Sequence, residues 1–289
     1  MWIADKWQDY RLIDTASGEK LEYWKDILLR RPDPQAVWTE KSEKKLWDKT
    51  DAWYHRSNSG GGHWQYFNKN LPQSWTVNYR ELTFNIKPMG FKHTGLFPEQ
   101  AVNWDWFSEL IKKAKRPIRV LNLFAYTGGA TVAALSAGAE VVHVDASKGM
   151  VTWAKENVVS SGLGDAPVRY IVDDVVKFVL REGRRGREYD AIIMDPPSYG
   201  RGPGGEVWKI ENELYPLILN CMEILSKKPL FFLINSYTTG LSASILSNIL
   251  TYTMVKKFGG SVESDEIGLP MQSNGLVLPC GISGRWKAE

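Results

Sequence analysis

Carboxylates and glycines stand at the ends of four apolar segments in the middle of the chain. The first segment runs into Phe124–Gly129, the second ends at Asp145, the third at Asp173-Asp174, and the fourth at Asp195-Pro196-Pro197. Paired glycines let a backbone pass close to a ligand, and a carboxylate can accept hydrogen bonds from both hydroxyls of a ribose. Each feature alone also fits a tight turn or a helix N-cap. Their repetition at four successive segment ends favours a nucleotide-containing ligand.

Alternating apolar and helix-length segments must position these residues. We expect strands at 119–126, 140–147, 168–174, 189–195 and 230–238, helices after each of them, and two further strands at the end of the chain. Strands separated by helices form βαβ units, whose parallel sheet is covered on both faces. The sequence therefore predicts an α/β fold with a doubly wound, seven-stranded, mostly parallel sheet. Its strands would present the four polar ends at one edge, where such sheets bind ligands.

The N-terminal part of the chain has a different composition. Ten of the thirteen tryptophans lie in the first 106 residues, among short aromatic and β-branched stretches separated by turn signals such as Ser17-Gly18. This predicts a smaller β-rich substrate or lid region at 1–90 and a second domain at 91–289. Most of these tryptophans are expected in the core. His63-Trp64, after Gly61-Gly62, is the stretch best suited to touching a substrate.

Composition narrows the partners and the location. The net charge of +3, from 36 basic and 33 acidic residues, neither demands nor excludes a nucleic acid. Two cysteines without a CxxC pair, and four histidines without metal-ligand spacing, predict neither a disulfide framework nor a metal site. The first residues do not read as a signal peptide and the apolar runs are too short to span a bilayer. We expect a cytoplasmic protein without a membrane partner; the oligomeric state is not predicted.

The loop after the first strand lacks the spacing of phosphate-binding motifs. Dinucleotide sites usually show G-x-G-x-x-G, and nucleoside triphosphate sites G-x-x-x-x-G-K-[ST]. Here the loop is Ala-Tyr-Thr-Gly-Gly-Ala at 125–130. The pattern favours a cofactor that carries a ribose and an adenine but little phosphate, and S-adenosyl-L-methionine fits that description.

At this point a family resemblance is evident. Residues 119–199 resemble a class I S-adenosylmethionine-dependent methyltransferase, and NLFAYTGGATVAALSAGAEVVHVDAS with MDPPSY is similar to the bacterial large-subunit ribosomal RNA methyltransferase family. FKHTGLFPEQ (91–100) resembles the family's segment that reaches over the cofactor. The resemblance covers roughly 90–240 and implies a Rossmann-like methyltransferase fold.

The resemblance also implies roles for individual residues. Phe124, Ala125, Tyr126 and Gly128 would surround the methionine part, with Thr127 and Gly129 in the same loop. Asp145 would hold the ribose, Ala146 and Ser147 would flank the adenine, and Asp173 or Asp174 would meet its amine. Thr94, Phe97 and Gln100 would close the site from the other side.

The Asp195-Pro196-Pro197-Ser198-Tyr199 stretch has a physical interpretation in this setting. Proline fixes φ and lacks an N–H group, so two in a row give a stiff loop whose carbonyls can accept hydrogen bonds. Asp195 can orient an amine or ring nitrogen or accept its proton, and Tyr199 can stack on a base. We expect Asp195, Pro196, Pro197 and Tyr199 to be catalytic. The alternative is that the prolines only end a strand and Tyr199 packs nearby.

The reaction follows from the placement of the cysteines. Cytosine C5 methylation needs a thiolate nucleophile, but Cys221 falls within an apolar helix and Cys280 on a late strand. We therefore expect methyl transfer to a base nitrogen in RNA, most naturally ribosomal RNA. A methyltransferase of the same fold acting on a small molecule or a protein remains open. A module that binds cofactor or RNA without turnover is a third possibility, against which the intact Asp-Pro-Pro-x-Tyr motif argues.

Overall fold

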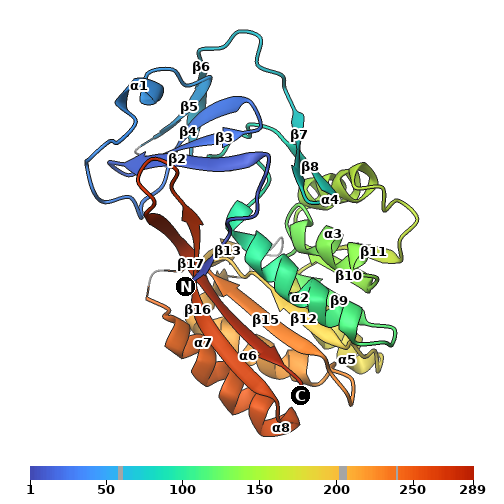
Figure 1. The fold of residues 1–289 in the computed structure, drawn as a ribbon. Coiled ribbons are helices and arrows are strands. Elements are labelled where there is room, and N and C mark those ends of the chain that lie inside the picture. The colour runs from blue at the N-terminus through green and yellow to red at the C-terminus, as the bar shows by residue number, and fades with distance from the viewer. Residues whose placement is uncertain (58–60, 202–206, 239) are drawn as a thin grey trace. The chain divides into compact units, whose positions relative to one another are not determined.

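The chain divides into two units (Figure 1). The computed structural model describes residues 1–57, 61–201, 207–238 and 240–289, and only the backbone of residue 201. Unit 1 comprises Met1–Val102 and Ile267–Cys280, and unit 2 comprises Asn103–Glu266 and Gly281–Glu289. The sequence pattern places a boundary near residue 90 and does not anticipate that the chain returns to unit 1. The return arises because two long strands, β16 (Ser261–Pro270) and β17 (Val277–Lys287), each contribute residues to both units.

Unit 1 is built on a five-stranded sheet in the order β2-β3-β4-β5-β6. The Ser17-Gly18 turn joins β2 to β3 with φ of 55° and 76°, as a tight two-residue hairpin requires. Ile13, Leu21, Leu28 and Trp47 form the small core beneath it. The elements are β1 (Trp2–Ile3), β2 (Tyr10–Ala16), β3 (Glu19–Trp24), β4 (Ile27–Pro32), α1 (Lys44–Trp47), β5 (Ala52–Arg56), β6 (Gly62–Tyr66), the hairpin β7 (Trp75–Tyr79) and β8 (Leu82–Ile86), and η1 (Pro98–Gln100).

Most of the predicted sheet lies in unit 2. Its strand order is β1-β16-β17-β15-β12-β9-β10-β11, which is eight strands where seven were predicted. The additional strand, β1, pairs with Ile267 and Gly268 in the part of β16 that belongs to unit 1. The neighbours from β15 to β11 pair in parallel, whereas β17 runs antiparallel to β15. The elements are α2 (Ala101–Lys113), β9 (Arg119–Leu123), α3 (Gly129–Ser136), β10 (Glu140–Asp145), α4 (Lys148–Ser160), β11 (Val168–Val172), α5 (Val175–Arg184), β12 (Ala191–Met194), β13 (Tyr199–Arg201), β14 (Val207–Lys209), α6 (Ile210–Met222), β15 (Phe231–Ser236), α7 (Ala243–Leu250), the π-helical turn η2 (Thr251–Val255) and α8 (Lys256–Phe258).

Helices cover both faces of this sheet. Leu121, Val142, Ile192, Phe232 and Trp286 form one continuous row across the strands and pack with buried residues of α5, α6 and α7. On the opposite face, α2 places the rings of Trp106 and Phe107 against Phe231, with centroids 5.5 and 5.8 Å apart. The doubly wound α/β fold predicted from the sequence is therefore confirmed.

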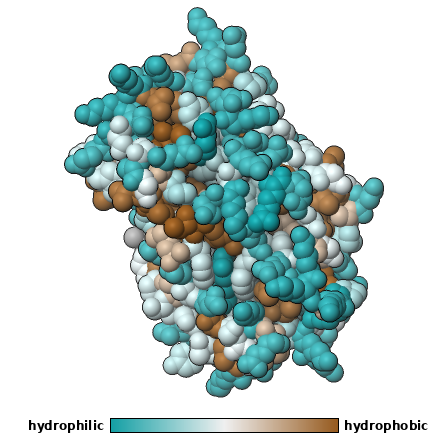
Figure 2. Space-filling view, viewed as in Figure 1, coloured by the Kyte–Doolittle hydropathy of each residue, from teal (hydrophilic) through white to brown (hydrophobic). Residues whose placement is uncertain are grey.

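Two elements of unit 2 lie outside the sequence prediction. They are α2, which precedes the first predicted strand, and the antiparallel strand pair β13–β14, which follows the Asp-Pro-Pro stretch. Within the described residues, no helix is both long and apolar enough to cross a membrane. On the visible face of the molecule, hydrophilic residues are spread widely, with apolar residues between them (Figure 2).

Candidate active site

The strand order of unit 2 changes direction at β9. From β9 the chain passes to β10 and β11 on one side, and then returns to β12 on the other. The Asp195 N–H points to the Leu123 carbonyl at 3.4 Å, so the carboxyl ends of β9 and β12 are adjacent. In open α/β sheets the ligand crevice lies at such a switch point. The structure therefore brings the loops after β9, β10, β11 and β12 to one edge.

The loop after β9 is held in an unusual backbone conformation. Phe124 and Tyr126 have φ of 53° and 50°, although neither is glycine. Each left-handed residue of this kind costs on the order of 1–2 kcal/mol, and such strain gathers at functional sites. Two bonds from β10 hold the loop: Ala125 N–H donates to the Val144 carbonyl at 3.0 Å, and Tyr126 N–H donates to Asp145 Oδ2 at 2.8 Å.

Gly128 and Gly129 join this loop to α3. Gly128 is the N-cap with φ of 81°, and a Cβ on it would lie 2.9 Å from the Cβ of Ala154 on α4. Position 128 therefore requires glycine for two reasons: its backbone is left-handed, and α3 packs too closely on α4 to leave room for a side chain. Gly129 is the first residue of α3, and Thr127 before the pair is buried.

Asp145, at the end of β10, is bonded to the loop after β9 and to the residue that precedes α4. Its Oδ2 accepts the Tyr126 N–H, and its Oδ1 accepts the Ser147 N–H at 2.8 Å. Partial burial raises the pKa of Asp145, and these two backbone donors oppose the rise. Ala146 and Ser147 are exposed, and the Ser147 hydroxyl caps α4 by accepting the Met150 N–H. Each Asp145 oxygen keeps a second lone pair for a ligand hydroxyl.

The end of β11 supplies an apolar neighbour for Asp145. Val172 pairs directly with Asp145 in the parallel ladder, and 49% of its surface is exposed. Asp173 pairs with Arg181, whereas Asp174 is the N-cap of α5 and accepts the Lys177 N–H at 2.9 Å. For Asp174, the structure therefore shows the helix N-cap role that the sequence left open as an alternative to ligand binding. Val172 was not singled out from the sequence, although its position as the last residue of a strand before two acids was a usable signal.

The Asp-Pro-Pro loop after β12 is braced by residues that follow it in the chain. Trp208 Nε1 donates to the Pro197 carbonyl at 2.6 Å, and the Trp208 ring lies 5.2 Å from that of Phe124. The hydroxyls of Ser198 and Thr238 are 2.6 Å apart. The Pro197 carbonyl was expected to be available to a substrate, but one of its lone pairs serves Trp208. Neither Trp208 nor Thr238 was found from the sequence.

Within this loop, exposure increases along the chain. Asp195 is half-buried, Pro196 is buried and Pro197 is exposed. Tyr199 begins β13 and has 51% of its surface exposed. The carboxylate thus lies at the base of the loop, while the phenol ring is accessible to a flat ligand.

A buried polar chain stiffens the sheet beneath the loops. Asn122 Nδ2 donates to Thr131 Oγ1, and Thr131 Oγ1 lies 2.9 Å from His143 Nδ1. The Thr131 hydroxyl therefore links the Asn122 amide to the His143 ring. Burial lowers the pKa of His143 to about 3, so the ring is neutral. Its Nε2 is buried without a hydrogen-bond partner among the residues that the structure describes.

A second buried polar cluster lies at the end of β15. Asn235 Oδ1 accepts from Asn103 Nδ2 at 2.9 Å and from Ser283 Oγ at 2.6 Å. Asn103 Oδ1 in turn accepts a hydrogen bond from the guanidinium of Arg285. Burial lowers the pKa of Arg285 to about 10. This cluster fixes the Asn235 amide between α2 and β17.

Thr94, Phe97 and Gln100 belong to unit 1 and are described with it. Thr94 and Gln100 are buried and Phe97 is half-buried; among the described residues, Thr94 Oγ1 has no hydrogen-bond partner. The surrounding segment is held by side chains of unit 1 that donate to its main-chain carbonyls. They are Trp64 to Met89, Tyr54 to Gly90, Arg31 to Lys92 and Trp7 to Pro98, at 2.8, 3.4, 2.8 and 2.8 Å.

This pattern explains part of the N-terminal tryptophan content. Trp24, Trp47 and Trp104 are buried, but the other seven of the ten are only half-buried. Most of these tryptophans were expected in the core. Instead, indole N–H groups such as those of Trp7 and Trp64 hold a segment that has few hydrogen bonds of regular secondary structure.

The two cysteines are poorly suited to nucleophilic chemistry. Burial raises the pKa of both Cys221 and Cys280, which disfavours the thiolate in each case. Cys221 lies on the buried side of α6. In the part of the chain that the structure describes, no group of three or more His, Cys, Asp or Glu side chains could hold a metal ion.

Known proteins with similar sequences are methyltransferases. A family model described as S-adenosylmethionine-dependent methyltransferase matches residues 52–217. The ribosomal RNA large subunit methyltransferase K/L of Shewanella frigidimarina is 30% identical over 145 residues, which are 50% of this chain and 20% of that protein. Ribosomal RNA large subunit methyltransferase I of Aeromonas salmonicida is 36% identical over 107 residues, 37% of this chain and 26% of its own length. The matched part is thus about a quarter or less of these relatives.

Solved structures extend the likeness to almost the whole chain. A SAM-dependent methyltransferase from Agrobacterium tumefaciens is 38% identical with a TM-score of 0.92, covering 98% of this chain and 91% of that one. A putative SAM-dependent methyltransferase from Streptococcus mutans, 20% identical with a TM-score of 0.72, covers 98% of this chain and 76% of that chain and shares the fold. This chain therefore belongs to the S-adenosylmethionine-dependent methyltransferase family, and S-adenosylmethionine is its cofactor.

Proposed function

We propose that this enzyme transfers the methyl group of S-adenosylmethionine to a base nitrogen in RNA, most naturally ribosomal RNA. The observation that carries the proposal is the pair of loops at the switch point. The loop of Asp195 and Tyr199 is braced by Trp208, which also contacts Phe124 of the strained loop held by Asp145. One loop suits a cofactor and the neighbouring loop suits a planar substrate.

The residues at this edge fit the cofactor by their chemistry. Asp145 offers lone pairs to the ribose hydroxyls, and half-exposed Val172 beside it offers an apolar surface to the adenine. The adenine amine would meet Asp173 or Asp174, of which the first pairs with Arg181 and the second caps α5. The 124–129 loop would surround the methionine part. The bound cofactor supplies a methyl group already activated on a sulfonium.

The Asp-Pro-Pro-x-Tyr loop would position the substrate. Tyr199 presents an exposed ring on which a base can stack. Asp195, at the base of the same loop, would accept a hydrogen bond or a proton from the attacking nitrogen. Nitrogen is favoured over cytosine C5 because C5 chemistry needs a thiolate, and burial keeps Cys221 protonated.

RNA is proposed as the substrate from the sequence relatives. Both are named as large-subunit ribosomal RNA methyltransferases, although this chain matches only a minor part of each. The expected roles of Thr94, Phe97 and Gln100 stay predictions.

The first test is methyl transfer into RNA. The protein is incubated with methyl-labelled S-adenosylmethionine and total RNA from cells that lack it, with nuclease-digested RNA as the control. Nuclease-sensitive label, found on a base nitrogen after digestion to nucleosides, is the expected result. Label in protein or in small molecules, or no label from protein that still binds the cofactor, would overturn the RNA substrate.

A pair of variants tests Asp195 in the same assay. Asp195→Asn removes the proton acceptor but keeps the shape of the side chain, and should lower the rate by about 10²–10⁴ while leaving cofactor affinity nearly unchanged. Asp165→Asn makes the same chemical change at an exposed residue after α4 and should retain the wild-type rate. Equal rates in the two variants would remove Asp195 from the reaction.

A further inference from the structure

Helix α4 turns two buried side chains toward the loop after β9. Ala154 and Asn157 are three residues apart, so they lie on the same face of the helix. Ala154 packs so closely on Gly128 that a Cβ there would lie 2.9 Å from its own. Asn157 Nδ2 donates a hydrogen bond of 2.8 Å to the Thr127 carbonyl. One face of α4 therefore contacts two consecutive residues of the loop, and both contacts are buried.

The hydrogen bond from Asn157 fixes the turn at residues 125–128. Within this turn, the Gly128 N–H donates to the Ala125 carbonyl at 3.0 Å. The Thr127 carbonyl and the Gly128 N–H belong to one planar peptide group and point in opposite directions. Because the carbonyl is bonded to Asn157 and the N–H to Ala125, the plane of this peptide is held from both sides.

The turn depends on such bonds because its backbone is strained. Tyr126 within the turn and Phe124 just before it have left-handed φ values, although neither is glycine. Strained residues of this kind persist only where the surrounding structure holds them in place. Val144 and Asp145 of β10 hold the first half of the turn through two amide N–H groups. Asn157 of α4 holds the second half through a carbonyl.

Helix formation does not explain an asparagine in the interior of α4. Asparagine is one of the weaker helix formers, and burying its amide costs free energy unless the amide is hydrogen-bonded. Asn157 is fully buried, and its amide reaches a main-chain carbonyl 30 positions earlier in the chain. The side chain is therefore explained by what it does for the loop after β9.

We propose that Asn157 is a positioning residue for the amino-acid part of the cofactor. It acts through the Thr127–Gly128 peptide, which it holds in the conformation that receives the methionine part of S-adenosylmethionine. This inference rests on the cofactor roles proposed above for the 124–129 loop and for Asp145. Because Asp145 serves the ribose and Asn157 serves the turn, variants of the two residues should differ in which ligands they weaken.

Two ligands that differ in the amino-acid part test this role without turnover. S-adenosylhomocysteine carries the adenosine and the complete amino-acid part, whereas 5′-methylthioadenosine keeps the adenosine and the sulfur but lacks the amino acid. Calorimetric titration of the full chain measures the Kd of each ligand. Asn157→Leu keeps a side chain of similar size without a donor. It should weaken S-adenosylhomocysteine binding about fivefold, the effect of one lost hydrogen bond, and leave 5′-methylthioadenosine binding unchanged.

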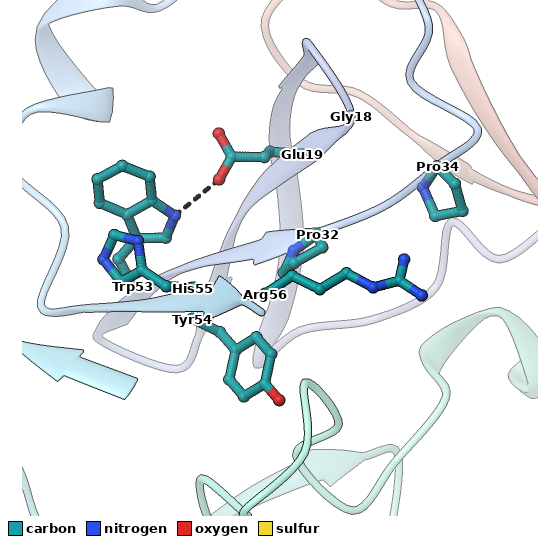
Figure 3. A pocket seen from close by; sticks show the side chains of 8 residues that line it. All are labelled: Gly18, Glu19, Pro32, Pro34, Trp53, Tyr54, His55 and Arg56. Carbon is teal, nitrogen blue, oxygen red and sulfur yellow. Dashed lines mark hydrogen bonds between the residues drawn. The ribbon is translucent and has the colours of Figure 1, made fainter. Parts of the chain in front are cut away.

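Further variants supply the controls. Asp145→Asn should weaken both ligands, because both carry the ribose hydroxyls. Trp53→Phe removes a comparable hydrogen bond in unit 1, where the indole N–H donates to Glu19 Oε1 at 2.7 Å (Figure 3), and should leave both affinities unchanged. Asn157→Ala also lacks the donor and repeats the test if Asn157→Leu does not fold. Thermal melting of each variant establishes that it is folded.

The outcomes separate this role from the proposed reaction. Equal weakening of both ligands in a folded Asn157 variant, unchanged affinity for both, or failure of both variants to fold would each overturn the positioning role, even where methyl transfer into RNA succeeds. A wild type that binds S-adenosylhomocysteine but not 5′-methylthioadenosine would overturn the division of the ligand on which the role rests. If the variant weakens S-adenosylhomocysteine alone but no label enters RNA, the positioning role stands and the proposed RNA substrate falls.

Discussion

The Tyr126 amide donates a hydrogen bond of 2.8 Å to Asp145 Oδ2, and Tyr126 is held there at a φ of 50°. The carboxylate that is suited to the cofactor ribose therefore also stabilises the strained loop after β9. Because both tasks use the ionised form, cofactor affinity and loop geometry should respond together to the state of this one side chain.

The affinity for S-adenosylmethionine should depend on pH through the Asp145 carboxylate. Burial raises the pKa of Asp145, whereas ribose hydroxyls that donate to the carboxylate favour its ionised form. The affinity for S-adenosylmethionine should be full above the raised pKa and should weaken as the pH falls through it. Calorimetric titration from neutral pH down to the ordinary aspartate pKa of about 4 measures this. Asp145→Asn should bind more weakly and lose this dependence; a pH-independent wild type would contradict the role of Asp145.

Gly128→Ala should destabilise unit 2. An alanine in the left-handed conformation costs about 1–2 kcal/mol. In addition, its Cβ would lie only 2.9 Å from the Ala154 Cβ, which is a steric clash. Thermal or urea unfolding measures the loss. Ala154→Gly in the Gly128→Ala background removes the clash but not the backbone cost, so it should recover only part of the lost stability. Full recovery would show that the backbone conformation is inexpensive, and wild-type stability in the single variant would contradict the close packing.

Trp208→Phe should slow catalysis without disturbing the cofactor. Phenylalanine keeps a ring against Phe124 but cannot donate to the Pro197 carbonyl, as Trp208 Nε1 does at 2.6 Å. Losing one hydrogen bond worth about 1 kcal/mol should lower kcat about fivefold. Steady-state kinetics with the RNA substrate, together with the Kd of S-adenosylmethionine, separates the two effects. A change confined to the cofactor Kd would assign Trp208 to the cofactor instead of the substrate loop.

His143 should contribute to acid sensitivity. Its pKa in the fold is lowered to about 3 by burial, against an ordinary value of about 6.5. Below about 6.5 the unfolded chain takes up a proton that the folded chain does not, so stability falls with decreasing pH, by up to about 1.4 kcal/mol per pH unit for one histidine. Stability is insensitive to this group above that window.

The variant His143→Gln tests this sign. The slope of the unfolding free energy against pH, from urea titrations between the two pKa values, should decrease by up to one proton relative to the wild type. His93→Gln should act similarly in unit 1, because burial followed by the charge of Arg31 lowers the pKa of His93 to about 3. An unchanged slope in His143→Gln would show that the ring is protonated within the fold.

Local sequence patterns predicted the main elements of unit 2. The apolar segments at 119–126, 140–147 and 168–174 appear as β9, β10 and β11, with the intervening helices in place. Periodicity and turn residues are local properties, so they can be read without knowing the fold. The parallel arrangement then follows from the helical connections, and it brings Phe124–Gly129, Asp145 and Asp195 to one edge.

Residues distant in sequence decided the rest. No local pattern links Trp208 to Pro197, or sends residues 267–280 back to unit 1, because these contacts depend on where strands lie in the completed sheet. The same is true of Val172, which becomes a candidate only because the register sets it beside Asp145. The sequence by itself determined the fold class, the cofactor and the polar strand ends. The tertiary structure decided which side chains brace those ends, because bracing requires neighbours that only the packed sheet brings together.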